Sequence, residues 1–289
     1  MPDFWTHILG GRKMIEGVDD EGLNDIIEKN NFLFNFACQG PDFLYYHKSW
    51  PSLKPKEGPK YAKMIHNEST KEMMTALVEK ICSLADSEIE NEKKLVYFLG
   101  FSAHYILDRD MHPLVFDMIG DDHDLHKILE LKIDNFLVEE YWKTETSVFS
   151  PVKAVDLGNN LPEFIEQFYR YLLRDIFEQK GDLAFIQESY SDFKRAKKLY
   201  YSPFRFKYYL LKIFNLFTDR NIMLYSHIEG KRYRFLTDKD YENIDDYFNS
   251  ALEKGAEFLE KIYKYWQGKI NLREFNTLIP HSNFNGRKY

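Results

Sequence analysis

The sequence predicts an all-α protein, and three observations carry this prediction. Apolar residues recur at helical spacing along most of the chain, whereas strand-like alternation is nearly absent. Glycine and proline number only 14 and 10 of the 289 residues, which disfavours a turn-rich all-β fold. Aromatic residues make up 17% of the chain, so large side chains are available for a core. We expect a single multi-helix domain over residues 1–289.

The first half of the chain shows four helical stretches and one loop. Residues 18–37 open with acids, which suit the positive end of a helix dipole, and continue with apolar residues at helical spacing. The proline-rich stretch 40–60 is predicted to be a loop. Long helical patterns follow at about 68–87 and 91–112, and another runs from the acidic turn at 120–122 to about Trp142. Pro113 is expected to end or bend the helix before it.

The second half adds further helices without a clear linker. Helical patterns recur at about 161–179, 183–200, 204–226 and 240–267. The only strand candidate is the short stretch 233–236. The best seam between domains is at 158–160, but one domain remains the preferred interpretation. The residues with metal-ligand patterns fall within 3–140, and the additional helices within 150–270.

Charge and cysteine content exclude several classes of protein. The net charge of −7 argues against a dedicated duplex-DNA binder. Two cysteines, Cys38 and Cys82, cannot form a disulfide framework, which favours a reducing compartment. The chain shows neither a signal-peptide pattern nor 18 consecutive apolar residues, so we expect a cytoplasmic protein without a membrane span.

Histidine placement is the most informative feature. Seven of the nine histidines lie in the first 126 residues. His104 and Asp108 are four residues apart in an otherwise apolar helical stretch, so their side chains share one face, about 6 Å apart at Cβ. Such a pair suits a metal ion held by a nitrogen and an oxygen. A buried aspartate there also requires a partner or a cation. His112 lies one further step along.

The next helix repeats this spacing with His126 and Glu130, and Asp134 lies one step further. Two such pairs on consecutive helices could face each other across a bundle core, where metal sites are built. Either pair alone is more often a surface ion pair. His47 is expected to be a solvated loop residue, and Cys38 a small buried residue.

The ordered set of residues resembles the zinc-dependent phospholipase C family, which shares its fold with the single-strand-specific zinc nucleases. The similarity rests on an N-terminal histidine, a Gln-Gly-Pro-Asp turn, a further histidine and the two helical pairs, and it covers about residues 3–140. The residues concerned are His7, 39–42, His66, His104, Asp108, His112, His126 and Glu130.

This resemblance implies a helical domain that holds two or three zinc ions in a cleft between helices. The first zinc would be held by Asp42, His66, His104 and Asp108. The second would be held by His112, His126 and Glu130. The third would use His7, with Asp108 as a bridge, and the N-terminus of the chain.

The chain departs from the secreted members of that family at two places. Those members begin with a tryptophan that ligates the third zinc, whereas this chain begins Met-Pro-Asp, with Trp5 inside it. Asp3 or the Pro2 amine is an alternative ligand there. The interval from Asp108 to His112 is also shorter, which leaves Asp110 or Asp117 as alternatives to His112.

The resemblance implies phosphodiester hydrolysis, in which metal-bound water attacks the phosphorus of a phospholipid-like substrate. Asp42 would be a ligand, the general base or both. Residues 194–217 interleave basic and aromatic side chains, typical of a core helix with a basic outer face. The same stretch would suit peripheral contact with phospholipid headgroups or stacking on single-stranded nucleic acid. A nuclease and a non-catalytic, metal-containing helical protein therefore remain alternatives.

Overall fold

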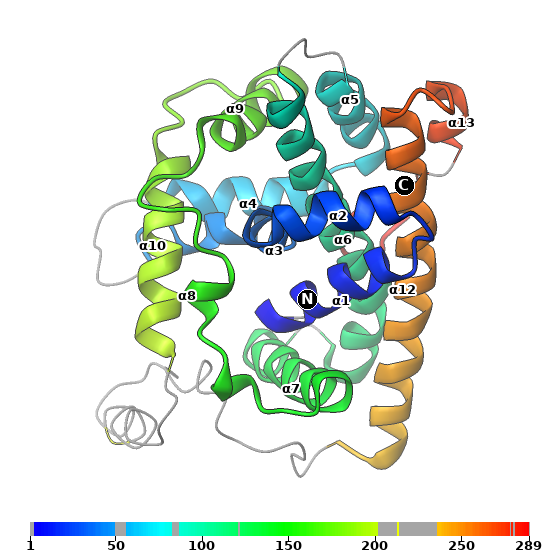
Figure 1. Ribbon diagram of the computed structural model, residues 1–289. Helices are drawn as coiled ribbons and strands as arrows, with labels where there is room; N and C mark the ends of the chain where they lie inside the picture. Colours follow the sequence, from blue (N-terminus) through cyan, green and yellow to red (C-terminus); the bar gives the residue numbers. More distant parts are fainter. Residues whose placement is uncertain are drawn as a thin grey trace.

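The computed structural model describes residues 3–49, 56–82, 87–120, 122–201, 213, 236–277, 279 and 281–288. Helices account for most of this part of the chain, and its only β pairing is an isolated bridge between Ser282 and Lys288. The predicted all-α class is therefore confirmed (Figure 1). The helical pattern predicted at 204–226 lies outside the described residues apart from residue 213, and the strand candidate at 233–236 lies outside them apart from residue 236.

The long helix α6, Glu88–Ile119, forms the centre of the fold. Ser87 begins it by accepting a hydrogen bond from the Glu90 amide, and Glu88 and Glu90 complement the positive end of its dipole. Nearly every side chain from Leu95 to Val115 is buried, so this part of α6 is enclosed on all sides rather than amphipathic.

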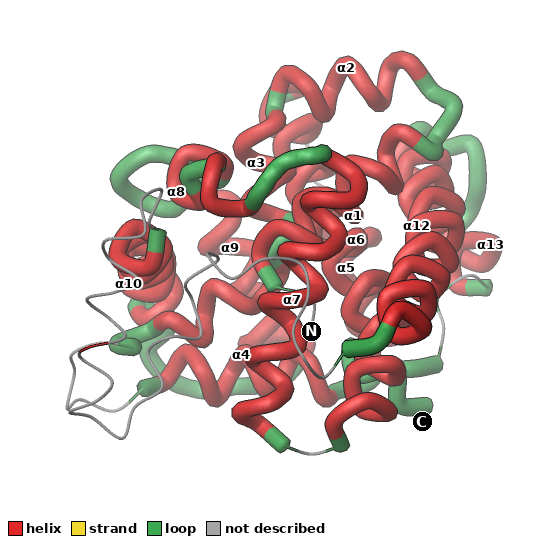
Figure 2. Tube along the Cα trace, turned by 90° about the horizontal axis from the view of Figure 1, so that it is seen from below, coloured by secondary structure: helices red, strands yellow, loops and turns green. Residues whose placement is uncertain are grey.

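Helices from both halves of the chain surround α6. Three of its main neighbours are α12 (Asp238–Trp266), α3 (Asn31–Ala37) and α1 (Phe4–Glu16). Two views place α12 and α10 (Phe185–Tyr200) on opposite sides of the molecule, with α1, α6 and α7 (His123–Trp142) between them (Figure 1, Figure 2). The remaining elements are α2 (Glu21–Lys29), the 3-10 helix η1 (Gly40–Tyr46), α4 (Glu57–Asn67), α5 (Thr70–Cys82), η2 (Thr146–Val148), α8 (Pro151–Ala154), α9 (Glu163–Tyr171), the π turn η3 (Leu172–Ile176) and α13 (Leu272–Asn276).

Several helix boundaries differ from the sequence prediction. The stretch 18–37 contains two helices, α2 and α3, which meet at Asn30. Helix α6 does not end at Pro113 but continues to Ile119, because Leu114 and Val115 are buried and their packing offsets the missing backbone hydrogen bond. Part of the predicted loop 40–60 forms η1 and the first turn of α4.

Helix α1 was not predicted, although it is one of the most buried elements. Most of its side chains are buried, including those of Phe4, Trp5, Ile8 and Leu9. An enclosed helix lacks the one-sided apolar pattern on which sequence prediction depends. None of the helices in the described part of the chain combines the length and the apolarity that a bilayer span requires.

Candidate metal centre

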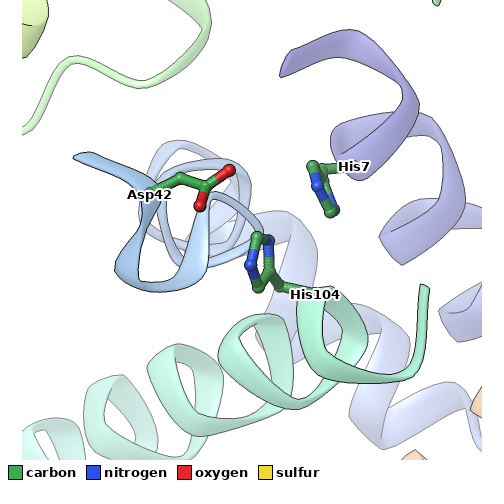
Figure 3. A group of neighbouring side chains, drawn as sticks. All are labelled: His7, Asp42 and His104. Atoms are coloured by element: carbon green, nitrogen blue, oxygen red, sulfur yellow. The ribbon is translucent and has the colours of Figure 1, made fainter. Parts of the chain in front are cut away.

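Four elements bring ionisable side chains together around Asp108. His7 comes from α1, Asp42 from η1, His66 from α4, and His104 shares α6 with Asp108. The ligand atoms of His7, Asp42 and His104 lie within 4.8 Å of one another, and so do those of His66, His104 and Asp108. Figure 3 shows that the side chains of His7, Asp42 and His104 approach one another from separate elements. The i, i+4 pair predicted from the sequence is thus joined by residues far away in the chain.

Asp108 is the common neighbour of three imidazole rings. Its Oδ1 lies 3.4 Å from Nε2 of His7. Its Oδ2 lies 3.3 Å from Nε2 of His104 and 3.4 Å from Nε2 of His66. Nε2 of His66 is also 3.2 Å from Oδ1 of Asp42. Both oxygens of one carboxylate therefore face ring nitrogens on different helices, an arrangement that suits a ligand bridging two cations.

Several polar atoms of these side chains are buried but have no hydrogen-bond partner in the described part of the chain. A buried, unpaired polar group carries a substantial desolvation cost, so such atoms are rare in folded proteins. Here they gather at one point, where they could hold a metal ion. The atoms are Nδ1 and Nε2 of His7, Oδ1 of Asp42, Nε2 of His66, Nε2 of His104 and both carboxylate oxygens of Asp108.

Backbone carbonyl groups orient three of the histidines. Nδ1 of His66 donates to the Ala62 carbonyl at 2.7 Å, and Nδ1 of His104 donates to the Cys38 carbonyl at 3.1 Å. Nδ1 of His112 donates to the Asp108 carbonyl at 2.8 Å. Because a carbonyl oxygen can only accept, each Nδ1 carries a proton, so Nε2 is the atom that can bind a metal when the ring is neutral. Metal-ligating histidines are commonly fixed in this way.

A second group lies where α6 approaches α7. The rings of His112 and His126 are 6.0 Å apart between centroids. Nε2 of His126 lies 2.8 Å from Oε1 of the buried Glu130, and Lys127 pairs with the other Glu130 oxygen at 3.0 Å. His112 is buried, whereas Asp117 is exposed and Asp110 pairs with Arg109 and Lys254. Of the three residues considered for this position, only His112 faces the second pair.

Asp134 fixes the start of α1 and therefore the position of His7. Its buried carboxylate accepts hydrogen bonds from the Trp5 amide at 2.9 Å and the Thr6 amide at 2.6 Å. Because the first amides of a helix have no partner within it, a carboxylate there is a strong anchor. The sequence placed Asp134 one step beyond Glu130 but gave no indication of this role, since the partners are more than a hundred residues away.

Gly40 permits the close approach of η1 to His104. Its φ of +50° is in the left-handed region, and a Cβ at this position would collide with the His104 ring. The Gly40 carbonyl accepts a hydrogen bond of 2.7 Å from the Tyr169 hydroxyl. Gly40 therefore places Asp42, two residues later, beside the histidines. The Gln-Gly-Pro-Asp pattern could have suggested this from the sequence.

Burial and neighbouring charges set the protonation of the centre. Burial lowers the pKa of both His7 and His112 to about 3, so both rings are neutral near pH 7. Burial also acts to lower the pKa of His66, but the carboxylates of Asp108 and Asp42 outweigh it and raise that pKa to about 10. The pKa of Asp108 and of Asp42 is lowered, because nearby imidazoles outweigh the effect of burial. The carboxylates of the site are thus ionised, and their negative charge favours a positively charged group beside them.

Two other predictions concern residues beside the centre. His47 is buried rather than solvated: its Nδ1 accepts from the amides of Glu57 and Gly58, both at 3.1 Å, and so caps the start of α4. The prediction of a solvated loop residue was therefore wrong. Cys38 is buried, as predicted, and its thiol pKa is raised by burial.

A cavity of about 360 Å³ opens beside both groups. Asp42 lines it from η1, and His126 and Glu130 line it from α7. Lys127 and Lys197 also reach its wall. Residues of the candidate centre are therefore accessible from one side, which a catalytic metal site requires and a closed structural site lacks.

The helical fold and this cluster define a protein with a candidate multi-metal centre of histidines and carboxylates. Comparison with protein-family models matches residues 6–180 to the family described as zinc dependent phospholipase C. Because the match spans more than half of the 289 residues, the chain belongs to this family. No curated protein and no solved structure matches the chain.

Proposed function

We propose that the protein is a metal-dependent phosphodiester hydrolase that cleaves phospholipid-like substrates in the manner of a phospholipase C. The observation that carries this proposal is the set of buried, unpartnered imidazole and carboxylate atoms around Asp108, which lies within the residues matched to the zinc-dependent family. The cavity beside them supplies access for a substrate.

We propose zinc as the metal, with two or three ions. Asp42, His66, His104 and Asp108 would hold one ion, and Asp108 would extend to a further ion at His7, as the short distances to all three rings support. His112, His126 and Glu130 would hold another. Bound zinc supplies Lewis acidity, which activates water and offsets negative charge on phosphate.

In the proposed reaction the oxygen of a water molecule bonds to phosphorus, and the bond from phosphorus to the diacylglycerol oxygen breaks. That oxygen takes up a proton, so the products are a diacylglycerol and a phosphorylated headgroup. Asp42 is the proposed acceptor of the proton from water, in addition to its role as a ligand. Its side chain is partly accessible, lines the cavity and has a lowered pKa, so it is ionised near neutral pH.

We also propose that both halves of the chain form one domain. Helix α12 from the second half packs along α6 and α1, and α10 packs against η1, which carries Asp42. The additional helices thus support the walls of the candidate centre.

The test is hydrolysis by zinc-loaded protein of short-chain phospholipids and of a single-stranded oligonucleotide. We expect release of diacylglycerol, and its loss in Asp42→Asn but not in the exposed control Asp19→Asn. Cleavage of the oligonucleotide alone would contradict the lipid substrate and favour a nuclease. Bound zinc without turnover of either substrate would favour a non-catalytic protein.

A further inference from the structure

Lys197 places a buried ammonium group on the wall of the cavity beside the candidate metal centre. It belongs to α10, and only 6% of its surface is exposed. Lysine is almost never buried to this extent unless its charge is compensated. Here aromatic rings and one carboxylate compensate the charge. Their arrangement affects which substrates the cavity can bind.

Three aromatic rings surround this ammonium. Nζ of Lys197 lies 4.6 Å from the ring centroid of Phe4, 5.4 Å from that of Tyr46 and 5.7 Å from that of Phe193. Asp3 Oδ1 lies 3.7 Å from Nζ, close enough for charge attraction but beyond hydrogen-bonding distance. All of these residues line the same cavity.

A cage of aromatic faces beside a carboxylate is the arrangement that binds quaternary ammonium groups. In this protein the chain's own lysine already occupies the cage. A headgroup with a fixed positive charge could not contact the aromatic faces, because Lys197 already occupies them. It would also be repelled by the positive charge of Lys197. Lys127 adds a second ammonium to the wall, although it is paired with Glu130.

We propose that Lys197 is a specificity-determining residue that excludes cationic headgroups and favours uncharged or anionic headgroups rich in oxygen. The ammonium has three N–H donors, and the 3.7 Å separation from Asp3 leaves them able to bind a hydroxyl or an acid oxygen of the headgroup. This inference rests on the proposed function, because it assigns the cavity to the headgroup of the phosphodiester substrate.

The test compares binding of phosphocholine and glycerol 1-phosphate to zinc-loaded protein by calorimetry. Both probes carry the same phosphate, so the ratio of their dissociation constants isolates the contribution of the headgroup. We expect the wild type to bind glycerol 1-phosphate about tenfold more tightly or better, and Lys197→Met to reduce that preference by about tenfold. Lys198→Met is the control, because Lys198 is the next residue of α10 and is exposed.

Equal binding of both probes by the wild type, or an unchanged ratio in Lys197→Met, would overturn the proposal. If the methionine variant fails to fold, Lys197→Gln carries the same expectation, because it also removes the charge. Absence of binding by either probe would show that the cavity is not a headgroup site. Zinc-dependent hydrolysis of bis(p-nitrophenyl) phosphate, measured on the same samples, shows separately whether the proposed function holds.

Discussion

Nε2 of His66 lies 3.4 Å from Oδ2 of Asp108, and neither atom has a hydrogen-bond partner within the described part of the chain. The carbonyl of Ala62 fixes the His66 ring from its other side, so this orientation does not depend on Asp108. A buried aspartate left without compensation would cost several kcal/mol. In the proposed centre these two side chains would be ligands of the same cation.

Asp108→Asn should remove more metal than any other single substitution, because Asp108 is near His7, His66 and His104 at once. We expect its zinc affinity to fall by about 100-fold or more. This loss equals or exceeds the largest effect typical of residues that only orient a metal ligand through a hydrogen bond. The measurement is zinc content by elemental mass spectrometry after gel filtration. Asp110→Asn is the control, since Asp110 is on the same helix but pairs with Lys254. Full zinc content in Asp108→Asn would rule out a bridging role.

His126→Ala should remove about one zinc ion and leave the ions at Asp108 in place, because His126 belongs only to the second group. Zinc titration with a competing chelator gives the number of sites in each variant. His281→Ala serves as the control, since His281 is an exposed histidine. Loss of all zinc in His126→Ala would mean that the two groups do not bind independently.

Gly40→Ala should destabilise the protein by more than the usual cost of replacing a glycine that has a positive φ. The added methyl group would collide with His104, and we expect about 1–3 kcal/mol of destabilisation beyond the backbone strain. Gly158→Ala is a matched control, because Gly158 has a φ of +99° but no atom near the added methyl group. Urea unfolding of both variants separates these costs. Equal destabilisation by the two would show that contact with His104 is unimportant.

The metal-free protein should lose stability between about pH 4 and pH 7 through Asp134. Burial, with a contribution from Asp3, raises the Asp134 pKa from 3.8 to about 7 in the folded state. The folded state therefore binds the proton more tightly than the unfolded state. The resulting stabilisation is fully present below about pH 3.8 and is lost as the pH rises through about 7.

Urea unfolding at several pH values checks this dependence. Relative to wild type, Asp134→Asn should show a flatter decline in the free energy of unfolding across that range, because asparagine does not ionise. Asp19→Asn, at an exposed position, should follow the wild-type curve. Parallel curves for Asp134→Asn and wild type would contradict the raised pKa of Asp134.

The sequence predicted the parts of the centre that depend on local spacing. His104 and Asp108 share a face because four residues make about one helical turn, and the same holds for His126 and Glu130. The apolar stretch around His104 indicated that this pair is buried, as observed. The class of fold followed from the same helical periodicity.

Features that depend on distant contacts could not be predicted in this way. Asp134 anchors Trp5 and Thr6 across more than a hundred residues, and no local pattern marks that partnership. His47 looked solvated because its surroundings are rich in proline, yet it caps α4 and contacts Glu188 on α10. Such roles become visible only when the helices are assembled.

The central claim is that these side chains form a clustered metal centre, and metal stoichiometry tests it most directly. The protein would be purified without an affinity metal column, supplied with zinc, passed through gel filtration and analysed by elemental mass spectrometry. Two or three zinc ions per chain are expected from the groups around Asp108 and Glu130. No bound zinc after this treatment would contradict the account, because the two helical pairs would then be simple ion pairs.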